Sequence, residues 1–80
     1  MLPEHEYHIG WAVYQMRVGK AVQRKGWNGK GMYLKVQFPD AGSANSLPYV
    51  WMRTADGHRV PWLCSQTDLL ANDWQIVEGV

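Results

Sequence analysis

The sequence predicts an α+β domain in which an N-terminal helix packs on a small antiparallel β-sheet, with a short helical turn near the C-terminus. Three observations predict this class. Apolar residues recur at helical spacing in the first 18 residues, later segments alternate around Asn-Gly and Asp-Gly turns, and a Ser-x-x-Asp pattern begins at residue 65. The length of 80 residues predicts a single domain, residues 1–80.

The first helix is predicted over residues 3–18. Pro3 suits the first helical turn, and Glu4 and Glu6 favour the positive end of the helix dipole. Gly19 is predicted to end the helix in a left-handed conformation, and Gly10 indicates a close approach of the helix to the sheet. The apolar stripe consists of Ile9, Ala12, Val13 and Met16.

Two strands follow, over residues 21–24 and 32–38. The Asn28-Gly29 pair between them predicts a tight hairpin turn, because both residues tolerate positive φ. In the second strand, alternation separates two faces. One face is predicted to carry Met32, Leu34, Val36 and Phe38, and the other Tyr33, Lys35 and Gln37.

A second hairpin is predicted after a loop over residues 39–48. In the strand over 49–54, Val50 and Met52 face one way, whereas Tyr49, Trp51 and Arg53 face the other. An Asp56-Gly57 turn leads to a strand over 59–63, in which Pro61 indicates a sheet edge or a break. Arg53 and Arg59 flank this turn and are available to pair with Asp56.

The C-terminal part is predicted to contain a short helix and a last strand. Ser65, with Asp68 three residues later, has the spacing of a capping box and starts a helix through Ala71. The last strand covers residues 74–77.

Composition excludes several functional classes. The formal charge of +1 argues against a duplex-DNA binder, which needs a basic face. No apolar run approaches the roughly 18 residues of a membrane span. The N-terminal MLPEHEYH has no apolar core of a signal peptide, and a cytoplasmic protein with a reduced Cys64 is predicted. Three histidines without a Cys-x-x-Cys pair predict no metal site.

So short a chain usually needs a disulfide, a metal site or a partner subunit, and oligomerisation is the one of these that the sequence leaves open. A single cysteine forms no intrachain disulfide, and a chain of this size buries only roughly 60–65% of its unfolded surface. The chain also carries five tryptophans, more than a small core holds. Trp11 and Trp74 are predicted to be core, whereas others would lie at a subunit interface or in a pocket.

Two stretches, GKAVQRKGWNGKGMYL (19–34) and MRTADGHRVPWLCSQTDLLANDWQIV (52–77), together with IGWA (9–12), resemble the phage-encoded Thoeris anti-defence proteins. The resemblance covers nearly the whole chain, and the loop over 39–47 is the least similar part. It implies a homotetramer of α+β subunits with ligand sites between subunits. It also implies non-catalytic sequestration of glycocyclic ADP-ribose, the signal of Thoeris immunity, in the host cytoplasm. Some relatives capture cyclic dinucleotides.

The residues suited to such a ligand lie in these stretches. Trp27 would either stack on a base or be buried in the core or at an interface. The same two alternatives apply to Trp62. Asn28 would read a base edge or only make the turn. Arg24, Lys25 and Lys30 are phosphate partners or a solvated face.

The start of the second helix is the other candidate. Gln66 and Thr67 lie where free N–H groups suit phosphate, whereas Asp68 would accept ribose hydroxyls or simply cap the helix. No catalytic set is evident. Cys64 is interpreted as a small buried hydrophobic residue rather than a nucleophile paired with His58. The alternatives to a ligand trap are a structural phage protein with a tryptophan-rich oligomer interface, and a single-stranded nucleic-acid binder.

Overall fold

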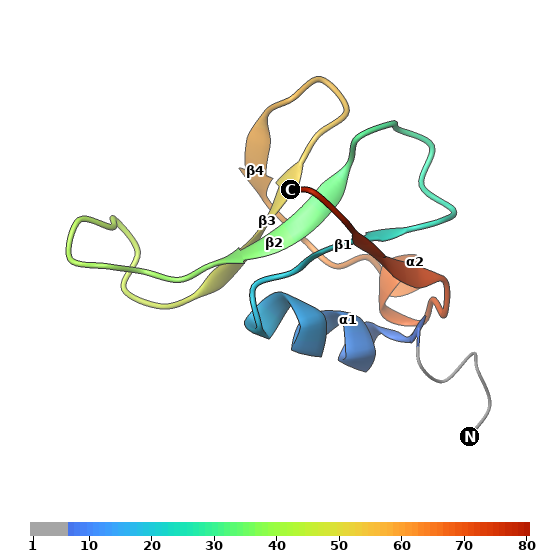
Figure 1. Cartoon of the computed structure of the whole chain (residues 1–80), viewed down its shortest axis with the longest axis horizontal. Helices are drawn as coiled ribbons and strands as arrows, with labels where there is room; N and C mark the ends of the chain where they lie inside the picture. Colours follow the sequence, from blue (N-terminus) through green and yellow to red (C-terminus); the bar gives the residue numbers. More distant parts are fainter. Residues whose placement is uncertain (1–6) are drawn as a thin grey trace.

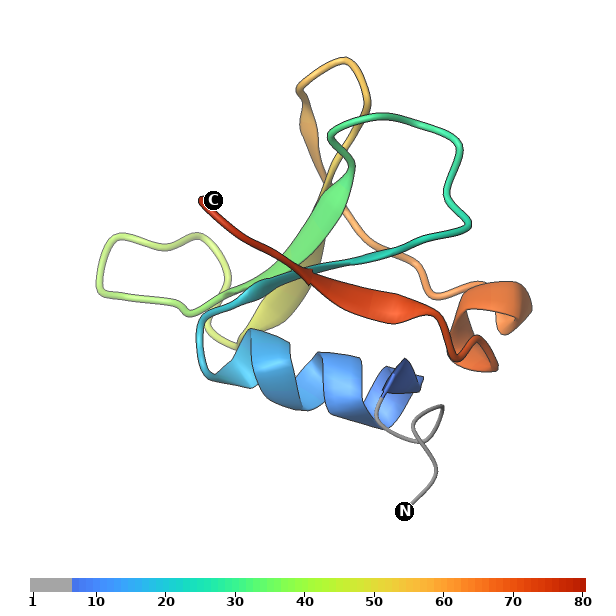
Figure 2. The ribbon, with the colours of Figure 1, turned by 45° about the vertical axis from the view of Figure 1, so that its right-hand side comes forward.

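The computed structural model describes residues 7–80, and its strands form one antiparallel sheet in the order β4-β3-β2-β1-β5. Helix α1 lies against one face of this sheet, over β1, β2 and β5 (Figures 1 and 2). The predicted α+β class is therefore confirmed. The elements are α1 (Ile9–Arg17), β1 (Ala21–Arg24), β2 (Tyr33–Gln37), β3 (Tyr49–Arg53), β4 (Arg59–Pro61), α2 (Gln66–Leu69) and β5 (Trp74–Val77).

Helix α1 begins at Ile9, with His8 as its N-cap. The Nδ1 atom of His8 accepts a hydrogen bond from the backbone N–H of Trp11 at 3.0 Å. The predicted start at Pro3, with Glu4 and Glu6, lies outside the described residues. The explanation predicted for Gly10 is wrong, because the residue is exposed and a Cβ there would meet the His8 ring at 3.0 Å. Gly10 therefore leaves room for the cap, not for the sheet.

The end of α1 is confirmed at Gly19. This residue has φ of 93°, and its N–H donates to the carbonyl of Met16. The N–H of Lys20 donates to the carbonyl of Gln15, which completes a Schellman motif. Glycine suits this position because a left-handed backbone places no Cβ against a carbonyl. The motif turns the chain directly into β1.

The connection between β1 and β2 is not the predicted tight turn at Asn28-Gly29. Neither residue has positive φ, and the left-handed residue is Gly31 (φ 77°). The reason lies in strand pairing. Strand β1 pairs with β5 along its whole length but with β2 only at Val22 and Leu34. The two strands therefore diverge, and an eight-residue loop over 25–32 joins them.

The two faces of the sheet differ as alternation predicted. Leu34 and Val36 of β2, with Val50 and Met52 of β3, face the core beneath α1, whereas Trp51 belongs to the opposite face. The fully buried cluster consists of Ala12, Met16, Val22, Leu34 and Trp74. The prediction of a core tryptophan is confirmed for Trp74, whereas Trp11 is half-buried at the margin of the core.

The last elements confirm the predicted edge and cap. Strand β4 is an edge strand and ends at Pro61, two residues before the predicted Leu63. The hydroxyl of Ser65 accepts from the N–H of Asp68, as predicted, but α2 ends at Leu69. The predicted burial of Cys64 is wrong, because this residue, between β4 and α2, is exposed. Over residues 7–80, neither helix has the length and apolar character of a membrane span.

Candidate functional site

Three tryptophans from distant parts of the chain form a cluster at one end of the core. Trp74 of β5 is fully buried. Trp27, from the β1–β2 loop, packs on it edge-to-face with ring centroids 5.5 Å apart and an interplanar angle of 80°. Trp62, which follows β4, does the same at 6.0 Å and 88°. The buried ring thus supports two half-buried indoles that reach the surface.

Asp68 of α2 ties this cluster together. Its Oδ1 atom accepts hydrogen bonds from Arg24 Nη1 at 2.8 Å and from Trp27 Nε1 at 3.2 Å. Its backbone carbonyl accepts from Trp74 Nε1 at 3.3 Å. Asp68 is 9% exposed, and a carboxylate that deep requires such partners. One residue of a four-residue helix therefore holds both Trp27 and Trp74.

Arg24 is shared between two carboxylates. Its Nε donates to Asp73 Oδ1 at 2.8 Å, while Asp73 Oδ2 accepts from the N–H of Gly26 at 2.9 Å. These hydrogen bonds lower the pKa of Asp73 and raise that of Arg24. A Cβ on Gly26 would lie 3.1 Å from Asp73 Oδ2, so a glycine permits this approach. The start of the β1–β2 loop is thereby fixed to the residue before β5.

The structure brings together four of the eight ligand-binding residues predicted from sequence: Arg24, Trp27, Trp62 and Asp68. The other four are exposed, in the two segments that carry Trp27 and Asp68. Asn28 and Lys30 lie on the β1–β2 loop, and Gln66 and Thr67 form the first turn of α2. Their exposure leaves their side chains available at the surface.

Sequence reasoning missed two residues of the cluster, Asp73 and the supporting role of Trp74. Both depend on the register of β1 against β5, in which Arg24 lies directly opposite Trp74. The residues are 50 positions apart in the numbering, and no local signal links them. The charge of Arg24 is also compensated by two carboxylates. Lys25 and Lys30 of the β1–β2 loop are exposed and form no ion pair within residues 7–80.

Cys64 and His58 do not form a nucleophile–base pair in this arrangement. His58 Nδ1 lies 3.2 Å from Asp56, which also accepts from Thr54. Asp56 thus pairs with its own turn, and the expected pairing with Arg53 or Arg59 is wrong. Partial burial and the charge of Asp68 raise the pKa of Cys64, whereas a reactive thiol requires a lowered pKa.

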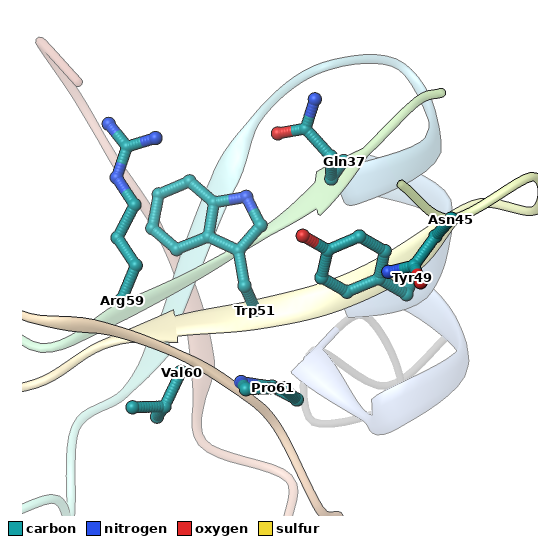
Figure 3. A pocket seen from close by; sticks show the side chains of 7 residues that line it. All are labelled: Gln37, Asn45, Tyr49, Trp51, Arg59, Val60 and Pro61. Carbon is teal, nitrogen blue, oxygen red and sulfur yellow. The ribbon is translucent and has the colours of Figure 1, made fainter. Parts of the chain in front are cut away.

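Further hollows lie away from the tryptophan cluster. A cavity of about 150 Å³ lies beside Trp51 on the sheet face opposite α1 (Figure 3), and one of about 160 Å³ adjoins it. They share Gln37, Asn45 and Tyr49. An apolar groove of about 480 Å³ runs between α1 and the start of β3. None of these three hollows is lined by the eight residues predicted from sequence.

Comparison with known proteins identifies the family of this chain. A family model described as the Thoeris anti-defense 2-like domain matches residues 7–77, which include the whole tryptophan cluster. The chain belongs to the Thoeris anti-defense 2-like family. This family member is 37% identical over 82 residues to Thoeris anti-defense 2 of Bacillus phage SP01, a match that covers 86% of this chain and 92% of that protein. The resemblance of the sequence is confirmed, and membership supports a role in phage anti-defence.

Proposed function

We propose that this Thoeris anti-defense 2-like protein sequesters a nucleotide immune second messenger and so inhibits bacterial anti-phage defence. The ligand is of the glycocyclic ADP-ribose class, with cyclic dinucleotides as a second class, and it is held without being cleaved in the host cytoplasm. The observation that carries the proposal is membership of the family over residues 7–77. The tryptophan cluster supplies the chemistry that this ligand requires.

The exposed parts of the cluster match the parts of a cyclic nucleotide. Trp27 and Trp62 offer aromatic surface to the bases, and a stacked base gains roughly 1–3 kcal/mol. Asn28 offers an amide to a base edge. Lys30 offers a charge to a phosphate, and charge-assisted hydrogen bonds are the stronger kind. Gln66 and Thr67 add polar groups from α2.

Arg24 and Asp68 act in this proposal mainly through the position of Trp27. The guanidinium of Arg24 is paired with two carboxylates, so its contribution to a phosphate is reduced. Both side-chain donors to Asp68 use its Oδ1 atom. The Oδ2 atom is therefore the oxygen that the proposal assigns to a ribose hydroxyl.

A second copy of the chain completes the site in this proposal, and the assembly is a homotetramer. Supporting this, Leu63 and Leu70 flank α2 and are 90% and 80% exposed. Large exposed apolar side chains at both ends of α2 favour an interface beside the cluster. Light scattering on the purified protein tests it. The mass of several chains is expected, and Leu63→Glu is expected to lower it, with the exposed Lys20→Glu as the matched control.

The decisive experiment separates trapping from catalysis. The protein is incubated with glycocyclic ADP-ribose, freed of unbound ligand, and heated to release what it holds. Recovery of intact ligand is expected. If the ligand is already cleaved before heating, the protein is an enzyme. If no ligand is retained, the proposal is rejected for this messenger.

The same exposed leucines favour the second candidate, a structural phage protein whose tryptophans and leucines bury subunit contacts. Tryptophan fluorescence distinguishes the two. Titration with the messenger quenches the emission of the wild-type protein if Trp27 stacks on a base, and the Trp27→Phe variant loses that part of the response. A response unchanged by ligand in both proteins favours the structural role.

A further inference from the structure

The sheet face opposite α1 gathers donors around Trp51. In the β3 register, Trp51 lies opposite Lys35 of β2 and Pro61 of β4. The guanidinium carbon of Arg59 lies 4.5 Å from the centre of its ring, and Tyr33 packs beside it with centroids 5.9 Å apart. Because Arg59 covers one face of the indole, the part that Trp51 offers to a ligand is its N–H edge.

That N–H edge has no hydrogen-bond partner among residues 7–80. The indole N–H groups of Trp27 and Trp74 each donate to Asp68, but within residues 7–80 no protein group accepts from Trp51 Nε1. Trp51 is 7% exposed. Every side-chain nitrogen or oxygen of residues 7–80 that is closed off from solvent has a hydrogen-bond partner. The nitrogen therefore retains an opening to solvent. A donor in such a position is paired by water or by a ligand rather than by residues 7–80.

The charges on this face also have no counterion among residues 7–80. Lys35, Arg53 and Arg59 lie on it, and β2, β3 and β4 contain no Asp or Glu. Arg53 and Arg59 are directly opposite each other in the register, an arrangement that repels. No ion pair in the described part of the chain includes any of these three cations. A bound anion would offset this repulsion.

Two of these groups, Trp51 and Arg59, line a cavity of about 150 Å³. Figure 3 shows the indole nitrogen of Trp51 on the side of the ring toward Gln37 and Tyr49, with Arg59 beside the six-membered ring. Asn45, from the loop between β2 and β3, lies next to Tyr49. Indole, guanidinium, amide and phenol groups all donate hydrogen bonds, and no carboxylate lines the cavity. Such a lining selects an acceptor-rich anion.

We propose that this cavity is a second binding site, for the oxyanion group of a phosphate or phosphate ester, with Trp51 Nε1–H and the guanidinium of Arg59 as its principal donors. The site is separate from the tryptophan cluster, because Trp51 and Trp27 lie on opposite sides of the sheet. The adjoining cavity of about 160 Å³, lined by Pro39, Ser43 and Asn45, provides room for the organic part of an ester.

The test uses the five indole N–H signals of the ¹⁵N-labelled full chain, one for each tryptophan. Trp51→Phe identifies the Trp51 signal by its loss. Inorganic phosphate, phenyl phosphate and neutral phenol are then titrated separately at constant ionic strength. The Trp51 signal is expected to shift with both phosphates and not with phenol. Tighter binding of phenyl phosphate would identify an ester as the ligand, and equal binding would identify free phosphate.

Arg59→Gln tests the second donor. It is expected to weaken binding by about tenfold, the loss of one charge-assisted hydrogen bond. Arg59 is exposed, and unchanged signals of the other tryptophans show that the fold is kept. Lys20→Gln is the matched control and is expected to bind normally. A shift with phenol, no shift with either phosphate, or equal binding by Arg59→Gln would overturn the proposal. A shift confined to Trp27 would also overturn it while leaving the messenger site intact.

Discussion

The tryptophan cluster around Asp68 and the sheet face around Trp51 use the same residue types in opposite ways. In the cluster, Arg24 is paired with two carboxylates, and the N–H groups of Trp27 and Trp74 each have an acceptor. On the sheet face, Arg59 covers the indole of Trp51, whose N–H has no acceptor among residues 7–80. The first region pairs its charged groups and the N–H groups of Trp27 and Trp74 internally. The second leaves the N–H of Trp51 and the charge of Arg59 without a partner among residues 7–80.

The difference indicates that the cluster fixes side-chain positions, whereas the sheet face around Trp51 is suited to binding. A network that is internally satisfied fixes side-chain positions, because each hydrogen bond removed would leave a desolvated partner behind. Trp27 and Trp62 can then present aromatic surface in a set orientation. A face with unpaired donors does not stabilise the fold by itself, but it is ready to bind an acceptor. Substitutions in the two regions should therefore affect different properties.

Arg24→Met is expected to have the largest effect on stability. It leaves the buried carboxylate of Asp68 without its cation and also unpairs Asp73. Removal of one partner from a buried ion pair costs about 3 kcal/mol. Urea unfolding measures the loss, and Lys25→Met, at the exposed neighbouring position, is the control. A loss no larger than that of the control would mean that the network does not hold the cluster.

Trp27→Phe is expected to cost less. The ring can still pack on Trp74, but the hydrogen bond from the indole to Asp68 is lost. A hydrogen bond to a charged group contributes about 1.5 kcal/mol. Urea unfolding of Trp27→Phe and of Arg24→Met, with the double variant, also reports their coupling through Asp68. Simple additivity would contradict a shared network.

Acid is expected to weaken the cluster through Asp73. Its pKa is lowered in the folded chain, first by the hydrogen bond from Arg24. A lowered folded pKa contributes stability that is present above the unfolded value of about 3.9 and is lost as the pH falls through the folded pKa. Thermal melts between neutral pH and strong acid measure this loss. The Asp73→Asn variant is expected to be less stable at neutral pH and to lose less stability as the pH falls. If the variant loses as much stability in acid as the wild-type protein, other carboxylates cause the acid sensitivity.

Arg59→Gln is expected to have the smallest effect on stability. The variant loses the cation–π contact with Trp51, worth about 0.5–1 kcal/mol at an exposed site, but relieves the repulsion with Arg53. A net change within about 0.5 kcal/mol is expected in urea unfolding. A loss as large as that of Arg24→Met would show that the two regions are not different in kind.

Local signals were sufficient for most elements. The Schellman end at Gly19, the Ser65 cap, the edge at Pro61 and the alternation of β2 and β3 each depend on residues within a few positions of one another. Local reasoning was wrong where a distant partner intervened. The Asn28-Gly29 pair does not make the turn, because the pairing of β1 with β5 draws the strands apart. Gly10 serves the His8 cap rather than the sheet.

The sequence by itself determined the α+β class, the resemblance to the family, and the stretches in which the candidate site lies. Periodicity, capping and motif order are properties of neighbouring residues, so they can be read along the chain. Only the tertiary structure decided that Arg24 is paired with Asp68 and Asp73, and that Arg53 lies opposite Arg59. Strand register sets these contacts, and register results from packing of the whole sheet against α1 rather than from any one segment.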